Sequence, residues 1–94
     1  MNEKDLFEDK LMELFTNVSS VRIMYCMAKH DNPLAIKTIS EKTEIPKKEI
    51  SVWLRKMIKQ DIAHKLPKRK YDLTDKGYCA LYNFHITYYK KVNK

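Results

Sequence analysis

The side chains of this 94-residue chain that could do chemistry are mainly cations, and they are concentrated in one segment. Residues 45–70 contain nine Lys/Arg and two Asp/Glu, whereas residues 1–44 contain six and eight, and residues 71–94 contain four and two. A local excess of positive charge is typical of a surface that binds a polyanion. A lysine-rich face that only keeps a protein in solution has the same composition, so both interpretations stay open.

No catalytic or metal-binding motif accompanies these cations. The chain has no Gly-rich phosphate loop, and its histidines, His30, His64 and His85, are far apart in the sequence. We therefore expect no enzymatic activity, no metal and no cofactor. Cys26 and Cys79 lie outside any CxxC pattern and are expected to be reduced and buried. A disulfide between them, or a redox or metal sensor that they form with His85, is the alternative.

The spacing of apolar residues predicts a mostly helical single domain. The chain has only one Gly and three Pro, which disfavours a turn-rich β fold. Apolar residues recur every three to four positions in four segments, at residues 4–16, from 19 or 20 to 30, 37–43 and 46–60. Asp31-Asn32-Pro33 ends the second of these helices, and Pro46 suits the first turn of the fourth.

Past Asp61 the apolar period shortens to two residues, which predicts a β-hairpin over residues 62–73. Its tip is Pro67-Lys68-Arg69-Lys70, a turn with three adjacent cations. Thr74 is expected to cap a last helix, with Asp75 in the first turn, where an acid complements the helix dipole.

Three stretches together resemble a known family. They are "SSVRIMYCMAKHDNPLAIKTISEKTEIPKKEIS", "ISVWLRKMIKQDIAHK" and "YDLTDKGYCALY", and the last contains a Leu-Thr-x-x-Gly step into a helix. In this order, residues 19–77 resemble the MarR and ArsR group of winged helix-turn-helix regulators, and the short versions found in archaea and their viruses. Glu44 and Asp61 stand where that group usually has Gly, and Ala35 stands where a Ser or Thr cap is common.

The resemblance implies a single winged-helix DNA-binding domain over residues 1–94, with helices added at both ends. Helix 46–60 would enter the major groove of double-stranded DNA, and the wing, residues 66–71, would reach the backbone or the minor groove. A core stripe of Ile50, Leu54, Met57 and Ile58 would leave the cations of this helix on its outer face. The expected DNA contacts are Lys47, Lys48, Ser51, Val52, Trp53, Arg55, Lys56, Lys59, Lys68, Arg69 and Lys70. Of these, Trp53 is at a border of the helix, where half-buried packing is the more common arrangement.

The terminal helices, within residues 1–17 and 75–94, predict a homodimer. They carry more apolar surface than one small domain can bury, and two-fold dimers are the commonest closed assembly. The expected interface residues are Phe7, Leu11, Leu14, Tyr78, Leu81, Tyr82, His85, Tyr88, Tyr89 and Val92. A terminal helix folded back on its own domain is the alternative.

These observations favour a DNA-binding transcriptional regulator. Non-specific or architectural nucleic-acid binding, or a winged-helix protein-interaction module, would use the same fold. The longest uncharged run, residues 77–89, is too short and too polar to span a membrane, and no signal peptide is visible at the start. We therefore expect no membrane partner and a cytoplasmic location, in the host cell if the source is viral.

Overall fold

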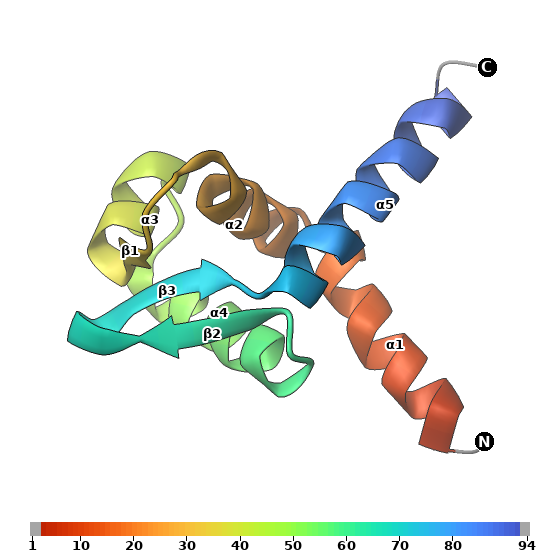
Figure 1. The fold of residues 1–94 in the computed structure, drawn as a ribbon, viewed down its shortest axis with the longest axis horizontal. Helices are drawn as coiled ribbons and strands as arrows, with labels where there is room; N and C mark the ends of the chain where they lie inside the picture. The colour runs from red at the N-terminus through yellow and green to blue at the C-terminus, as the bar shows by residue number, and fades with distance from the viewer. Residues whose placement is uncertain (1–2, 93–94) are drawn as a thin grey trace.

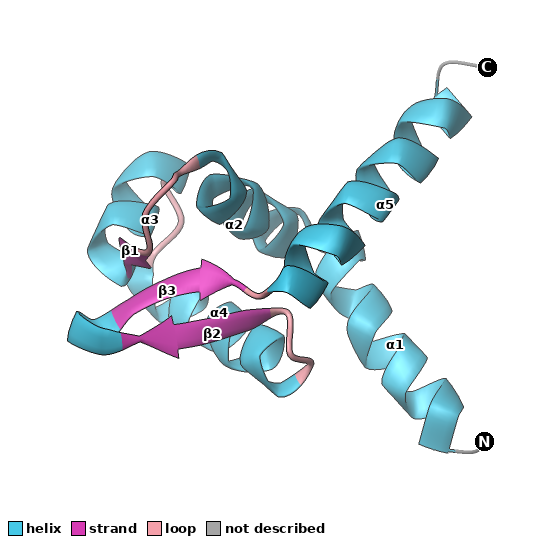
Figure 2. Ribbon diagram, in the orientation of Figure 1, coloured by secondary structure: helices cyan, strands magenta, loops and turns pink. Residues whose placement is uncertain are grey.

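The structure is a computed structural model that describes residues 3–92, with the side chains of residues 10–85. Five helices and three short strands follow one another along the chain (Figures 1 and 2). The predicted mostly helical architecture with a β-hairpin is confirmed. In order, the elements are α1 (Glu3–Thr16), α2 (Val18–Lys29), β1 (Leu34–Ala35), α3 (Ile36–Thr43), α4 (Lys47–Lys59), β2 (Ala63–Leu66), a 3₁₀ turn (Pro67–Arg69), β3 (Lys70–Leu73) and α5 (Asp75–Val92).

The sheet is antiparallel, with the strand order β1-β3-β2. Strands β2 and β3 form the predicted hairpin, which we call the wing, and Ala63 pairs with Leu73 at its base. Strand β1 was not predicted, because two residues are too few to show a period. It pairs Leu34 with Tyr71 and thereby ties the segment before α3 to the wing.

The core lies between α2, α3, α4 and the sheet, while α1 and α5 project to the side away from the tip of the wing (Figure 1). Leu14 and Leu81 are 0% and 4% exposed, so α1 and α5 each supply a residue to this core. The fully buried side chains come mainly from the helices, and include Leu14, Ile23, Met24, Met27, Ile39, Ile50, Leu54, Met57 and Ile62.

Helix α4 buries a different stripe from the one predicted. Trp53 is 8% exposed and packs in the core with Ile50, Leu54 and Met57, whereas Ile58 is 41% exposed. Both stripes have helical spacing, and Trp53 and Ile58 stand on opposite borders of the buried face. The tertiary packing of α4 places the larger side chain inside, and an indole buries more apolar area than an Ile side chain does. The prediction of Trp53 as a DNA contact is therefore wrong, as is that of Ile58 as a core residue.

Of the two side-chain caps that the sequence predicted, the one at α5 is confirmed and the one at α2 is wrong, and Pro46, expected in the first turn of its helix, stands just before α4. Asn17 caps α2, since its Oδ1 accepts a hydrogen bond from the Ser20 N–H at 3.1 Å, so the predicted cap at residue 19 or 20 is wrong. Thr74 caps α5 as predicted, because its Oγ1 accepts from the Gly77 N–H at 2.9 Å.

Two residues at positions where the group that the sequence resembles usually has Gly adopt the left-handed conformation. Glu44 ends α3 with φ 62°, and Asp61 follows α4 with φ 59°. A side chain in this region costs about 1–2 kcal/mol, and Asp tolerates it better than Glu. The chain bends at both points despite this cost, and each bend sets the direction of a neighbouring element, α4 after Glu44 and β2 after Asp61.

Gly77 allows α5 to begin directly against the base of the wing. A Cβ atom at this position would lie 2.0 Å from the carbonyl oxygen of Ile62. The same carbonyl accepts the Thr74 N–H at 2.9 Å, and the Thr74 hydroxyl donates to the Asp61 carbonyl at 2.6 Å. No side chain fits between these backbones, which explains the Gly of the Leu-Thr-x-x-Gly step.

We predict that Gly77→Ala lowers the free energy of unfolding by about 3 kcal/mol, because the added methyl group would meet rigid backbone. Urea unfolding monitored by circular dichroism measures this. Asn83→Ala, at an exposed position of α5, is the control and should change the value by less than about 0.5 kcal/mol. Equal stability of the Gly77→Ala variant and the wild type would show that α5 does not begin against Ile62.

Candidate nucleic-acid interface

The outer face of α4 carries Lys48, Val52, Arg55 and Lys59, and we call it the recognition face. All four residues are exposed, Val52 by 46%. At 100° per residue they lie opposite the buried Ile50, Trp53, Leu54 and Met57. The face thus combines three cations with one apolar side chain. The sequence predicted these four residues there together with Lys56. Ser51 is half-buried beside it.

The first turn of α4 also carries cations. Lys47 and Lys48 are exposed there, and Pro46 precedes them without a side-chain cap. Cations at a helix N-terminus oppose the helix dipole by about 0.3–1 kcal/mol each. An anion bound at the first turn would reverse this effect, since free N–H groups and cations would both face it.

Lys56 faces α1 rather than the recognition face. Its ammonium lies 2.7 Å from the Glu13 carboxylate and 4.8 Å from the centre of the Trp53 ring. This is the one ion pair among the side chains described. Because both partners are about half exposed, the pair contributes less than about 1 kcal/mol to stability. The sequence did not signal it, since the two residues are far apart along the chain.

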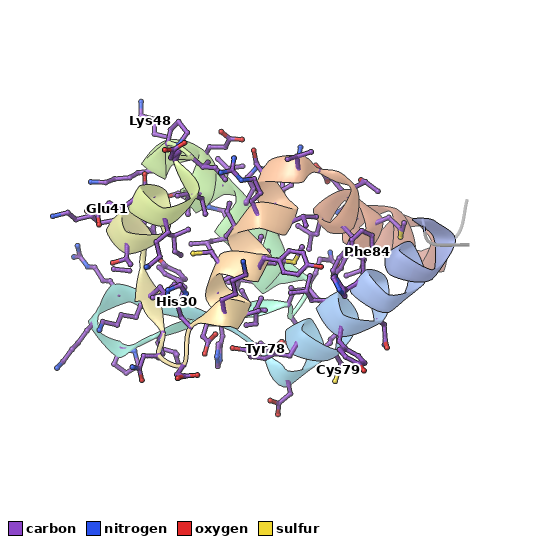
Figure 3. All side chains as sticks on the ribbon, turned by 90° about the horizontal axis from the view of Figure 1, so that it is seen from above. His30, Glu41, Lys48, Tyr78, Cys79 and Phe84 are labelled. Carbon is purple, nitrogen blue, oxygen red and sulfur yellow. The ribbon has the colours of Figure 1, made fainter. Side chains whose placement is uncertain are left out.

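The tip of the wing presents the second group of cations. Lys68, Arg69 and Lys70 are all exposed, and Lys68 and Arg69 adopt positive φ angles of 65° and 55°. The wing tip lies at the end of the molecule opposite α1 and α5 (Figure 1). Lys48 lies toward this same end of the long axis, far from Phe84, but at the opposite edge of the view from the wing (Figure 3). Two cationic groups from separate elements are therefore both distant from the terminal helices, on different sides of that end.

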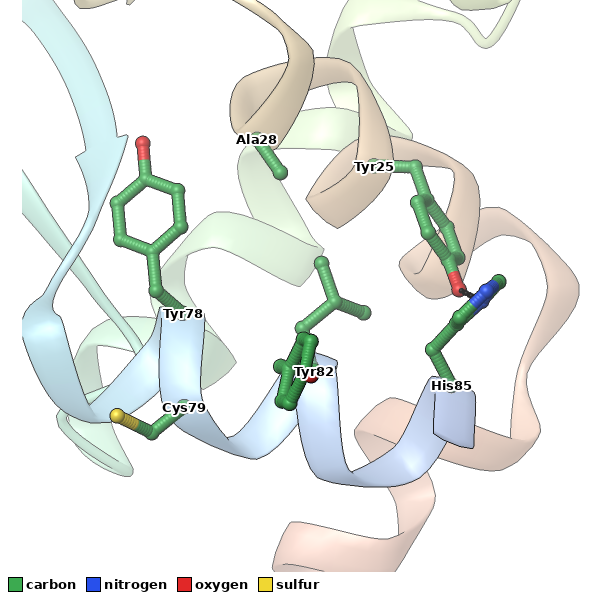
Figure 4. Close-up of a pocket in the computed structure, with 7 residues that line it drawn as sticks. Tyr25, Ala28, Tyr78, Cys79, Tyr82 and His85 are labelled. Atoms are coloured by element: carbon green, nitrogen blue, oxygen red, sulfur yellow. Dashed lines mark hydrogen bonds between the residues drawn. The ribbon is translucent and has the colours of Figure 1, made fainter. Parts of the chain in front are cut away.

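The other end, between α2 and α5, is aromatic. A cavity of about 450 Å³ opens there, and Tyr82 at its rim is 65% exposed (Figure 4). Tyr25 and His85 share a hydrogen bond of 2.5 Å between the Tyr hydroxyl and Nδ1, and their rings meet edge to face. A second cavity, of about 590 Å³, adjoins these two residues and extends toward Phe15 and Val18.

The predicted dimer residues divide into three groups. Leu14 and Leu81 are buried in the core of this chain, so the prediction that they meet a partner is wrong. Their spacing on the helices could not show which chain covers them. Leu11 is half-buried, and Tyr78, Tyr82 and His85 are exposed. The side chains of Phe7, Tyr88, Tyr89 and Val92 lie outside those that the structure describes.

The two cysteines are free and differ in exposure. Cys26 is buried, as expected, whereas Cys79 is exposed on α5, so neither the disulfide nor the burial of both thiols is found. Burial raises the pKa of the Cys26 thiol, and the nearby ammonium groups of Lys42 and Lys29 partly oppose this rise. Over the described residues, no three His, Cys, Asp or Glu side chains are grouped to hold a metal ion.

Tyr78 is tied to the wing. Its hydroxyl donates a hydrogen bond of 2.8 Å to Asp72 of β3. Burial, this hydrogen bond, and the negative charges of Asp72 and Asp31 raise the pKa of Tyr78 to about 12. The contact adds a side-chain link between α5 and the wing to the backbone contact at Gly77.

None of the helices described is long and apolar enough to cross a membrane. No protein-family model and no curated protein matches the sequence. Among solved structures, the chain is similar to HlyU from Vibrio cholerae N16961, with a TM-score of 0.68 and 16% sequence identity. The match covers 94% of this chain and 98% of HlyU. This likeness shows the winged-helix fold that the sequence predicts.

We predict that Tyr78 ionises near pH 12, as measured by the phenolate absorbance that is lost in Tyr78→Phe. The folded state favours the protonated phenol of Tyr78. Its contribution to the free energy of unfolding is therefore fully present below pH 10, the pKa of the unfolded chain, and is lost as the pH rises through the folded-state pKa of about 12. Asp72→Asn should move this pKa toward 10, because it removes the neighbouring charge. A wild-type pKa of 10 would contradict the contact.

Proposed function

We propose that this protein is a DNA-binding transcriptional regulator that acts as a homodimer, with α4 in the major groove. The observation that carries the proposal is the recognition face, where three cations and Val52 are all exposed and no described side chain covers them. A helix that buries one face and presents cations and one apolar residue on the other suits the major groove. The winged-helix fold, which is shared with HlyU, supports this use of α4.

Each group on the recognition face suits a different part of DNA. The planar guanidinium of Arg55 can donate two hydrogen bonds to a guanine, and Val52 can contact a thymine methyl group. Lys47, Lys48 and Lys59 suit phosphates, which position a protein without reading the sequence. Lys56 becomes available for a phosphate only if it leaves Glu13, so we propose a smaller part for it.

The wing tip supplies a second contact in this arrangement. Lys68, Arg69 and Lys70 are exposed on a turn that extends from the domain, at the end where Lys48 lies (Figures 1 and 3). Cations so placed suit the phosphate backbone or the adjacent minor groove. The wing is held by β1 on one side and by Thr74 at its base, which fixes its direction relative to α4.

A homodimer would cover the aromatic end of the molecule. Both terminal helices project there, and the large exposed side chains include Met12, Val18, Tyr78 and Tyr82. A two-fold dimer through this end would place two copies of α4 about 34 Å apart, one turn of B-DNA, on a pseudo-palindromic site. For this function we propose that the protein acts in the cytoplasm, binds no membrane and catalyses no reaction.

Two other functions would use the same surface, and only binding data separate them. An architectural protein would bind all sequences alike, whereas a regulator should prefer its site by about 10³-fold or more at physiological salt. A protein-interaction module would not bind DNA. The cations at the recognition face and at the wing tip disfavour this last role.

We predict that Lys48→Gln and Arg69→Gln weaken binding to all DNA sequences and each lower the slope of log K against log salt by about one. Fluorescence anisotropy over a salt series measures the slopes. Lys76→Gln, which removes a charge from α5, is the control and should leave the slope unchanged. Arg55→Gln should instead change the preferred sequence in a selection from random DNA. Slopes equal to the wild type in both variants would exclude these residues from the interface.

We predict a dimer for the wild type in sedimentation equilibrium and a monomer for Tyr82→Glu, because a carboxylate would be buried at an apolar interface. His64→Glu, at an exposed position on β2, is the matched control and should remain dimeric. The Tyr82→Glu monomer should also bind DNA more weakly, since it engages only one half-site. A monomeric wild type would refute the proposed assembly without affecting the recognition face.

A further inference from the structure

A third group of cations lies apart from both the recognition face and the wing tip. Between α2 and α3 there is a cavity of about 360 Å³. Helix α2 contributes Arg22 and Lys29 to its lining, and the last turn of α3 contributes Lys42. No Asp or Glu lines the cavity, which we call the Arg22 pocket. Its other polar groups include those of Cys26, His30 and Thr43.

The three cations converge on the pocket from two helices. The Arg22 guanidinium donates a hydrogen bond to the carbonyl of Thr43, the last residue of α3. Lys29 and Lys42 come from the last turns of α2 and α3, and both ammonium groups are near enough to Cys26 to influence its thiol. Charges of one sign that meet in this way raise the local electrostatic potential.

The two helix ends at the pocket neutralise only part of this charge. Each helix C-terminus is equivalent to about −0.5 of an elementary charge, so the ends of α2 and α3 together offset about one of the three cations. None of the three cations forms an ion pair with a described side chain. Asp31, the nearest acid along the chain after α2, acts on Tyr78 on the α5 side. The residues that line the pocket therefore keep an excess of positive charge, with Glu41 and Glu44 flanking Lys42 and Thr43 along the chain but not lining it.

His30 adds a directed polar group at the end of α2. Its Nδ1 lies 2.7 Å from the carbonyl oxygen of Cys26. A carbonyl can only accept a hydrogen bond, so Nδ1 carries the hydrogen and the ring is held in one orientation.

We propose that the Arg22 pocket binds a phosphate-class anion, either a small phosphorylated molecule or a backbone phosphate of DNA. The guanidinium supplies paired donors, two lysines supply charge, and the volume is in the lower part of the range of small-molecule sites, about 300–1,000 Å³. A bound phosphate would compete with the Thr43 carbonyl for Arg22. Thr43 precedes the turn at Glu44 that leads into α4, so occupancy of the pocket would influence the start of the recognition face.

The first experiment uses pyrophosphate as the probe, with the full chain and no DNA. Isothermal titration calorimetry at constant ionic strength should show saturable binding. The double variant Lys29→Gln/Lys42→Gln should weaken binding about tenfold or more, because it removes two charges from the pocket but no hydrogen bond made by its lining. The control Lys10→Gln/Lys65→Gln loses the same charge at exposed positions outside the pocket and should bind like the wild type. Equal loss in both double variants would overturn the proposal.

The second experiment separates the two sources of phosphate by repeating the DNA salt series with the same variants. Saturable pyrophosphate binding with an unchanged DNA slope supports a small phosphorylated ligand. A slope lowered by about two in Lys29→Gln/Lys42→Gln, without saturable pyrophosphate binding, supports a backbone phosphate. If neither saturable pyrophosphate binding nor a lowered DNA slope is observed, the proposal is overturned. If the wild type binds no DNA, the proposed function is refuted. The pyrophosphate titration then tests by itself whether the Arg22 pocket binds a phosphate-class anion.

Discussion

The backbone contact between Gly77 and Ile62 determines how the parts of this molecule are oriented. Ile62 ends the bend after α4 and begins the wing, and its carbonyl lies where a Cβ atom of residue 77 would otherwise be. Thr74 bonds to the carbonyls of Asp61 and Ile62 and also caps α5. The wing, the end of α4 and the start of α5 are therefore joined over a few backbone groups. A shift of α5 would also move the wing.

The recognition face depends on how α4 is buried. One helix supplies both core and surface, so its rotation about its own axis decides which side chains remain free. With Trp53 inside and Ile58 outside, the free face carries Val52 together with Lys48, Arg55 and Lys59. The Glu13–Lys56 pair then connects α1 to the edge of this helix. The helix proposed to meet DNA thus touches a terminal helix proposed to meet a second protomer.

Positive charge is divided among three surfaces with different physical settings. The recognition face and the wing tip are open and would be screened by salt, as expected for contacts with a charged polymer. The Arg22 pocket is concave, and its lysines lie beside two helix C-termini that absorb only part of their charge. Because Arg22 also holds the last carbonyl of α3, an anion there would act on the turn before α4.

Much of this protein could be predicted from its sequence, because the relevant forces act between neighbours along the chain. Periodicity marked the helices and the wing, Thr74 and Gly77 marked the start of α5, and residues 45–70 carried the excess charge. Only the tertiary structure decided between Trp53 and Ile58 at the borders of α4, joined Glu13 to Lys56, and buried Leu14 and Leu81 within the chain. It also left Cys26 buried and Cys79 exposed, and it placed Arg22 and Lys42 in the lining of one cavity. Such outcomes depend on which distant element packs against a residue, and spacing along one helix carries no information about that.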